Sequence, residues 1–372
     1  MQSIHITTSQ SNHLIQIPPP LEEVSEPLII LGTRGSALAR AQTTLVSKLL
    51  RAAHPDLSIE EKIITTIGDI TSERSNCFIQ RPPPQEVGSE RLTGDARPMM
   101  PLHEPTAEGS GLFTQQLEEA LFSHEIDAAV HSLKDLPVRT PMRLILAAIL
   151  PRAATNDLLI TLDQGGLEGL ASGATIGSSS PRRVELLRHR RCDLRFTTLR
   201  GNVPTRLRKL AMNQRDHPLD AIVLAQAGLE RLGYDLNIIK GEGCFMFDGT
   251  MLHVTELTWM LPAPGQGAIA IETRDVSDEK SSHDVSAYFS ALHDEKTAKC
   301  VQAERLLLQY LGGGCHMALG ALATLDESSQ QIALKGVYVP YAGATPREGE
   351  ARGATPEEVA LLVMTQLTDK LA

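Results

Sequence analysis

The chain has 372 residues, of which 42% are hydrophobic and 22% charged, and its formal net charge at pH 7 is −10. This composition is ordinary for a globular protein, and the length favours two or three domains over one compact core. The acidic balance argues against a general nucleic-acid-binding protein. No apolar stretch approaches the about 18 residues of a membrane span, so neither nucleic acid nor membrane is an expected partner.

The predicted elements begin after a loose tail over residues 1–27. Leu28–Leu31 is a short apolar run that predicts a strand, and Ser36 stands where a helix N-cap is expected. The helix that follows carries apolar residues at helical spacing, namely Leu38, Ala41, Leu45 and Leu49. The fold is therefore expected to start with a strand, a tight turn and a helix.

The same arrangement recurs in the middle of the chain. Ala174–Ile176 predicts a strand, Ser180 suits an N-cap, and Pro181 suits the first helical position. Two copies of one strand–turn–helix unit predict two α/β lobes. The amides at such helix N-termini favour anions, although most turns of this kind only connect elements.

Other apolar runs complete the prediction. Six of them read as strands: Ile63–Thr66, Ala128–His131, Leu144–Ile149, Leu158–Thr161, Ala221–Ala225 and Ala268–Glu272. A helix from Thr297 is expected to stop at Gly312-Gly313-Gly314. Two strands, at 317–324 and 332–339, then precede a C-terminal helix that opens with Thr355-Pro356.

This order predicts three domains. Domain 1 spans 28–151 and 267–285, domain 2 spans 152–266, and a small α+β domain 3 spans 286–372. One segment of domain 1, residues 72–110, has six prolines and no periodicity. We expect this segment to be a lid or an insertion that cleaves easily, because long structureless loops are rare inside compact domains.

The five cysteines are Cys77, Cys192, Cys244, Cys300 and Cys315, and no two form a CxxC pair. Such spacing predicts neither a disulfide framework nor a zinc site. We therefore expect a reducing, cytoplasmic location and no bound metal.

A basic block lies between Arg182 and Lys209, where nine Arg and one Lys stand against one Glu and one Asp. Inside an acidic protein, this block indicates either a field for a small anionic ligand or a solvated helix face. Composition alone leaves both interpretations open.

Nine stretches in order resemble the porphobilinogen deaminase family: GTRGSALARAQ (32–42), TTIGD (65–69), GLFTQQLEEAL (111–121), AVHSLKDLPV (129–138), GSSSPRR (177–183), LRGNVPTRLRKL (199–210), AIVLAQAGLERLG (221–233), APGQGAIAIETR (263–274) and LGGGC (311–315). The resemblance implies an α/β fold with two periplasmic-binding-protein-like lobes, a small α+β C-terminal domain, and an active site between the lobes. It also implies a monomeric enzyme that joins four porphobilinogen molecules head-to-tail into hydroxymethylbilane and releases ammonia.

By this resemblance, Asp135 is the catalytic residue, and a dipyrromethane cofactor is bonded to Cys315. The other residues expected to bind the cofactor are Ser36, Asp69, Lys134, Ser178, Ser180, Arg182, Arg183 and Arg200. Those expected to bind substrate are Arg34, Gln42, Phe113, Ser179, Arg206 and Arg231. The chemistry agrees, because each porphobilinogen carries two carboxylates and arginine binds carboxylates through two parallel hydrogen bonds.

The sequence departs from the family pattern at a few positions. Ser110 stands in place of a usual lysine, Gly312 in place of a usual glutamate, and residues 237–256 form a second extension. Two rival functions remain at this point. A non-catalytic anion-binding module predicts loss of Asp135 or Cys315, and both are present. A cysteine hydrolase that uses Cys315 and a histidine leaves the basic block unexplained.

Overall fold

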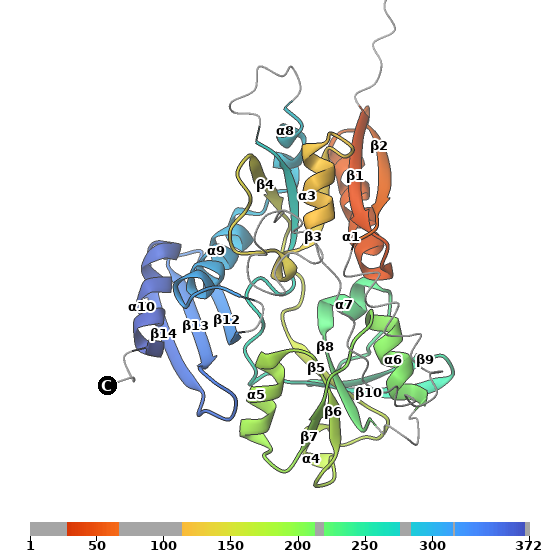
Figure 1. Ribbon diagram of the computed structural model, residues 1–372, viewed down its shortest axis with the longest axis vertical. Coiled ribbons are helices and arrows are strands. Elements are labelled where there is room, and N and C mark those ends of the chain that lie inside the picture. The colour runs from red at the N-terminus through yellow and green to blue at the C-terminus, as the bar shows by residue number, and fades with distance from the viewer. Residues whose placement is uncertain (1–27, 67–113, 213–218, 276–283, 315–316, 369–372) are drawn as a thin grey trace, which may run out of the picture.

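The computed structural model describes residues 28–66, 114–212, 219–275, 284–314 and 317–368 (Figure 1). The expected tail and the segment 72–110 lie outside this part of the chain. Three sheets, of five, six and three strands, organise the described residues. They confirm the expected α/β class with a small α+β unit at the C-terminal end.

The first lobe, at the top of Figure 1, is built on a five-stranded sheet in the order β2-β1-β3-β11-β4. Its strands are β1 (Leu28–Arg34), β2 (Ser58–Ile64), β3 (Ala128–Ser132), β4 (Leu144–Ile149) and β11 (Ile269–Arg274). β1 runs parallel to β2 and β3, whereas β11 runs antiparallel to both of its neighbours. Its helical segments are α1 (Ala37–Ala53), α3 (Gln115–Phe122), η1 (Leu133–Asp135), α8 (Ser286–Phe289) and η2 (Ser290–Leu292).

One strand boundary in this lobe was predicted wrongly. The strand expected at Ile63–Thr66 begins at Ser58 and ends at Ile64. β2 lies at the edge of the sheet, and its residues Glu60 and Glu61 are exposed to solvent. The apolar run therefore marked only the end of the strand.

The second lobe, at the bottom of Figure 1, has a six-stranded sheet in the order β7-β6-β8-β5-β10-β9. Its strands are β5 (Asp157–Thr161), β6 (Thr175–Gly177), β7 (Arg195–Thr197), β8 (Ala221–Ala225), β9 (Glu242–Phe247) and β10 (Thr250–Glu256). Its helices are α4 (Gly166–Gly169), α5 (Pro181–Arg190), α6 (Val203–Met212) and α7 (Gln226–Arg231).

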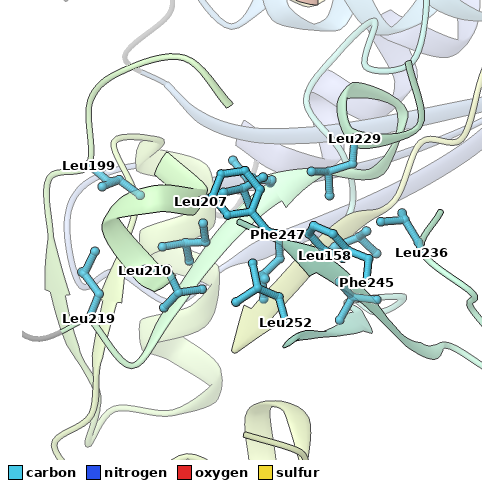
Figure 2. Packing of buried hydrophobic residues seen from close by; sticks show 14 residues of the cluster. Leu158, Leu199, Leu207, Leu210, Leu219, Leu229, Leu236, Phe245, Phe247 and Leu252 are labelled. Atoms are coloured by element: carbon cyan, nitrogen blue, oxygen red, sulfur yellow. The ribbon is translucent and has the colours of Figure 1, made fainter. Parts of the chain in front are cut away.

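The extension at residues 237–256 is part of this lobe's core. β9 and β10 form an antiparallel hairpin that continues the sheet beyond β5. Figure 2 shows Phe245, Phe247 and Leu252 of the hairpin packed against Leu158 and Leu207. The extension therefore adds two strands and buried apolar surface to the lobe.

The third domain is a three-stranded antiparallel sheet with two helices. Its elements are α9 (Glu295–Tyr310), β12 (Ala318–Leu325), β13 (Ile332–Val339), β14 (Arg347–Gly353) and α10 (Pro356–Thr368). β14 was not predicted, because its sequence REGEARG has no apolar alternation. The N-cap expected at Thr355 is confirmed, since its hydroxyl accepts a hydrogen bond from the Glu358 amide.

The chain crosses between the lobes twice, after β4 and after β10, and both crossings meet Glu304 of α9. The fully buried Glu304 carboxylate accepts hydrogen bonds from Arg152 Nη1 at 2.6 Å and Nη2 at 2.9 Å on the first crossing. On the second crossing, the Gly265 amide donates at 2.7 Å, and the Ala323 amide of β12 donates at 2.8 Å. Glu304 thus joins both crossings to the third domain.

No helix among the described residues is long and apolar enough to cross a membrane.

The contacts of Glu304 lead to a stability prediction. Replacing Glu304 by Gln removes the charge opposite Arg152 and points two amide hydrogens at groups that already donate. Because a buried cation then lacks its partner, the Glu304→Gln variant should lose about 3 kcal/mol or more of unfolding free energy. Chemical denaturation followed by circular dichroism measures this loss.

Glu295→Gln on the same helix is the matched control. The Glu295 side chain is 69% exposed and pairs only with surface groups, so its replacement should change stability by no more than about 0.5 kcal/mol. Equal effects of the two substitutions would contradict a special role for Glu304.

Candidate active site

The loop after β3 presents Lys134 and Asp135 at the end of a buried strand. Leu133 is fully buried and anchors the 3-10 turn, whereas Lys134 is half-buried and Asp135 is exposed. The Arg305 guanidinium of α9 binds the backbone of this loop. It donates to the carbonyls of Pro137 at 2.7 Å and Val138 at 3.1 Å, and more weakly to those of Leu133 and Leu136.

Lys134 contacts a side chain from the second crossing. Its ammonium donates to Gln266 Oε1 at 3.2 Å. Burial, and then the positive charge of Arg183 on the second lobe, lower the pKa of Lys134 to about 8. Lys134 therefore lies close to the basic residues of the second lobe, and it forms no ion pair with a carboxylate of the described residues.

Two arginines of the basic block share one buried carboxylate. Ser180 caps α5, as predicted, and the first turn of the helix directs Arg182 and Arg183 toward Asp157 at the start of β5. Arg183 reaches Asp157 Oδ1 at 2.6 Å, and Arg182 reaches Asp157 Oδ2 at 2.7 Å. Burial alone would raise the pKa of Asp157, but the two guanidinium charges outweigh it and hold the pKa well below its ordinary value.

The other ends of these guanidinium groups are also engaged. Arg183 donates to the Val223 carbonyl at 2.9 Å, and Arg182 donates to the Leu261 carbonyl at 2.8 Å. Both side chains are almost fully buried. Two positive charges thus stand against one negative charge at this point.

The serine hydroxyl groups that were predicted to bind ligand form hydrogen bonds to nearby backbone atoms. Ser36 caps α1 as predicted, and its oxygen accepts a hydrogen bond from the Ala39 amide. Ser178 Oγ accepts from the Ser180 amide, and Ser179 donates to the Leu199 carbonyl at 2.8 Å. These contacts shape the two turns at the helix N-termini, and ligand binding by the serines stays a prediction.

Gln42 and Arg34 come from the first strand–turn–helix unit. Gln42 is buried on α1 and donates to Ser132 Oγ at 2.9 Å, next to the Lys134 loop. Arg34 is the last residue of β1. Both therefore belong to elements that border the loop with Asp135.

Three further arginines of the expected site have no ion pair with a carboxylate in the part of the chain that the structure describes. Arg206 donates to the Gly201 carbonyl at 2.7 Å, and Arg231 donates to the Gly267 carbonyl at 2.6 Å. Burial lowers the pKa of both. Arg200 is exposed at the end of the loop before α6.

The structure therefore brings together residues from both lobes. Asp135 of the first lobe is close enough to Arg206 of the second for its charge to influence that guanidinium, and helices α1 and α7 of the two lobes contact each other (Figure 1). Asp69, Phe113 and Cys315 lie outside the described residues. The site combines surplus buried positive charge with one exposed carboxylate, which suits an anionic ligand on which a positive charge develops.

Sequence reasoning missed Asp157, Gln266 and Arg305. An aspartate at the start of a fully apolar strand is a signal that could have identified Asp157, because buried carboxylates need charged partners. Arg305 gave no such signal, since its partners are backbone carbonyls.

Two family models match this chain. One, described as "Porphobilinogen deaminase, dipyromethane cofactor binding domain", matches residues 29–81 and 85–283. The other, "Porphobilinogen deaminase, C-terminal domain", matches residues 298–369. The porphobilinogen deaminase of Roseiflexus sp. (strain RS-1) is 37% identical over 333 residues, which cover 90% of this chain and 92% of the relative. That of Rubrobacter xylanophilus is 36% identical over 342 residues, with coverages of 92% and 94%.

Similarities to solved structures are weaker. The methionine binding protein MetQ aligns with a TM-score of 0.36 and 12% identity, covering 73% of this chain and 92% of MetQ. The periplasmic aliphatic sulphonate binding protein SsuA from Escherichia coli aligns with a TM-score of 0.35 and 11% identity, covering 77% of this chain and 71% of SsuA.

The shared carboxylate gives a second prediction. Asp157→Asn leaves Arg182 and Arg183 buried without a negative charge, so the unfolding free energy should fall by about 3–5 kcal/mol at pH 7. A carboxyl whose pKa is depressed on folding stabilises the protein above its unfolded pKa of about 4 and loses that effect as the pH falls. The difference between wild type and variant should therefore shrink below about pH 4.

Thermal unfolding at several pH values tests this expectation. Asp193→Asn is the control, because Asp193 forms its ion pair with Arg191 at the protein surface. That substitution should leave the melting temperature nearly unchanged. A loss of stability for Asp157→Asn that is no larger than the control's would show that Asp157 does not hold the two arginines.

Proposed function

The chain belongs to the porphobilinogen deaminase family, and from that premise we propose that Asp135 is its catalytic residue and Cys315 the attachment point of its cofactor. The enzyme is a transferase that joins four porphobilinogen molecules head-to-tail into hydroxymethylbilane, with release of ammonia, in tetrapyrrole biosynthesis. Its cofactor is dipyrromethane. The observation that carries the assignment of Asp135 is its exposed carboxylate beside surplus cations from both lobes.

The residues present fit a dipyrromethane group. Its two pyrroles carry acetate and propionate side chains, so it brings several carboxylates into the site. Lys134, Arg206 and Arg231 are cations whose pKa burial lowers, and no carboxylate pairs with them among the described residues. A carboxylate ligand would offset the cost of burying these charges.

We assign the remaining contacts by resemblance. The cofactor is proposed to contact Ser36, Asp69, Lys134, Ser178, Ser180, Arg182, Arg183 and Arg200. The substrate is proposed to contact Arg34, Gln42, Phe113, Ser179, Arg206 and Arg231. The support for these assignments is the charge that the basic residues carry and the position of the serines at two helix N-termini.

Asp135 performs the electrostatic part of the reaction in this proposal. When bound, the cofactor supplies the pyrrole carbon to which the first substrate is joined. Loss of ammonia from a substrate leaves positive charge on its pyrrole nitrogen, and the Asp135 carboxylate stabilises that charge through the pyrrole N–H. The same carboxylate can accept and return the protons that the ring exchanges. Arg305 fixes the backbone of this loop, so the carboxylate needs little reorganisation.

We also propose that the enzyme works as a monomer in the cytoplasm. The monomeric state is proposed by resemblance to the family. The described cysteines Cys192, Cys244 and Cys300 are free thiols, which suits a reducing compartment.

The role of Asp135 is tested by Asp135→Asn. The variant keeps the size of the side chain and removes its charge, so turnover should fall by about 100-fold or more while the circular dichroism spectrum stays the same. Asp235→Asn, at an exposed position of the second lobe, is the control and should keep full turnover. Turnover of Asp135→Asn close to that of the control would refute the catalytic role.

The role of Cys315 is tested by mass. The purified chain should be heavier than its sequence by two pyrrole units, and Cys315→Ala should lack this addition. Cys192→Ala, which removes an exposed thiol elsewhere, should retain it. An unchanged adduct on the Cys315→Ala protein would place the attachment at another residue.

A further inference from the structure

Gln266 lies on the second crossing between the lobes, and no step of the proposed reaction involves it. Its side chain is fully buried and makes three polar contacts. Its Oε1 accepts from Lys134 at 3.2 Å, and its Nε2 donates to the Thr155 carbonyl at 2.7 Å and to Asp157 Oδ1 at 3.0 Å. Lys134 belongs to the first lobe and Asp157 to the second, so one amide connects the two.

The backbone around Gln266 holds this amide in place. Gly265 and Gly267 both have positive φ, of 75° and 89°. A Cβ at position 267 would lie 2.5 Å from the Ala153 carbonyl oxygen, so glycine is required there. The Gln266 carbonyl also accepts from Arg152 Nε at 2.9 Å. The side chain therefore leaves a backbone that is fixed on both sides.

The partners of Gln266 determine both its orientation and its type. Lysine only donates hydrogen bonds, whereas a carbonyl and an ionised carboxylate only accept them. A primary amide satisfies all three partners at once. A carboxylate at this position would face two acceptors, and an aliphatic side chain would leave the Lys134 ammonium without an acceptor among the described residues.

The charged groups around Gln266 affect how Lys134 can bind a ligand. Lys134, Arg182 and Arg183 carry three positive charges around the single negative charge of Asp157, and Asp135 is the other carboxylate that acts on Lys134. The neutral amide lies between the ammonium and Asp157. Its Nε2 donates to Asp157 Oδ1 while its Oε1 accepts from the ammonium, so Lys134 meets a neutral acceptor and forms no ion pair with Asp157.

We propose that Gln266 is a positioning residue, which holds the Lys134 ammonium for a ligand carboxylate and keeps it out of an ion pair with Asp157. The inference rests on the proposed function insofar as that carboxylate belongs to the cofactor or substrate. The proposal goes further in that Gln266 links the position of Lys134 in the first lobe to Asp157 and its two arginines in the second. A purely structural role for Gln266 would affect stability alone.

The first test follows the titration of Lys134 in the full-length protein without substrate. Reaction with acetic anhydride as a function of pH, read on the Lys134 peptide by mass spectrometry, gives the midpoint at which the amine becomes reactive. Gln266→Glu should raise that midpoint by about one pH unit, because a carboxylate favours the ammonium form. Gln266→Leu should lower it, because the ammonium loses its acceptor while Arg183, Arg182, Asp135 and Asp157 remain.

Lys335 is the internal control, since it is exposed on β13 and far from the junction. Its midpoint should be the same in all three proteins. The order Glu above Gln above Leu for Lys134 supports the proposal. The same Lys134 midpoint in all three proteins overturns it. This measurement involves no turnover, so it stands apart from the test of Asp135.

The second test uses KM and kcat. Gln266→Leu should raise KM for porphobilinogen about tenfold, the scale of one misplaced charge contact, while kcat changes less than about threefold. In the Lys134→Met background the same substitution should leave KM unchanged, because the residue it positions is gone. An equal rise of KM in both backgrounds would show that Gln266 does not act through Lys134.

Discussion

The architecture depends on one buried carboxylate that joins both crossings between the lobes to the third domain. Glu304 accepts four hydrogen bonds, from both nitrogens of the Arg152 fork and from the amides of Gly265 and Ala323. Burying an ionised carboxylate costs several kcal/mol unless all of its acceptor positions are filled. The two crossings and the third domain must therefore meet in this one arrangement for the cost to be offset.

Two residues connect Glu304 and its contacts to the candidate site. The crossing that supplies Gly265 continues into Gln266, which contacts Lys134 and Asp157. The next residue of α9 is Arg305, which binds the carbonyls of the loop with Asp135. The helix that leads to the proposed attachment residue Cys315 is thus also the helix that fixes the proposed catalytic loop.

The elements that could be predicted from the sequence are those whose signals lie within a few neighbouring residues. The N-caps at Ser36 and Ser180, the strands β3, β4 and β8, and the C-terminal helix all follow from residue type and spacing within a few positions. Two edge strands, β2 and β14, were harder to predict because they carry charged residues on faces that water covers, whereas the apolar edge strand β4 was predicted. The hairpin of β9 and β10 was missed since an extension to a family pattern gives no indication of where it packs.

The site was predictable to a similar degree and for similar reasons. Family motifs nominated Lys134, Asp135 and the arginines as candidates, but they did not indicate which arginines form ion pairs within the protein. Those ion pairs depend on Asp157, which lies outside the basic block and comes next to it because β5 and β6 both pair with β8. Gln266 and Arg305 act on atoms more than a hundred residues away in the chain, and no local pattern reports such contacts.

The ion pairs formed by the arginines of the basic block show how much of its positive charge is already neutralised within the protein. Within it, Arg188 pairs with Glu185 and Arg191 with Asp193, while Arg208 pairs with Asp248 and Arg182 and Arg183 share Asp157 from outside it. The local excess of positive charge read from the sequence is therefore larger than the charge available to a ligand. The cations of the block that form no ion pair with a carboxylate among the described residues are Arg190, Arg195, Arg200, Arg206 and Lys209, of which Arg206 and Lys209 are partly buried. Outside the block, Arg231 and Lys134 likewise pair with no carboxylate in that part of the chain. A partly buried cation that pairs with no carboxylate of the protein, such as Arg206, Arg231 or Lys134, attracts a ligand carboxylate more strongly than a solvated cation does, because screening by water and salt is weaker there. The proposed binding of a small polyanion therefore draws on these partly buried cations, and the acidic balance of the whole chain does not oppose it.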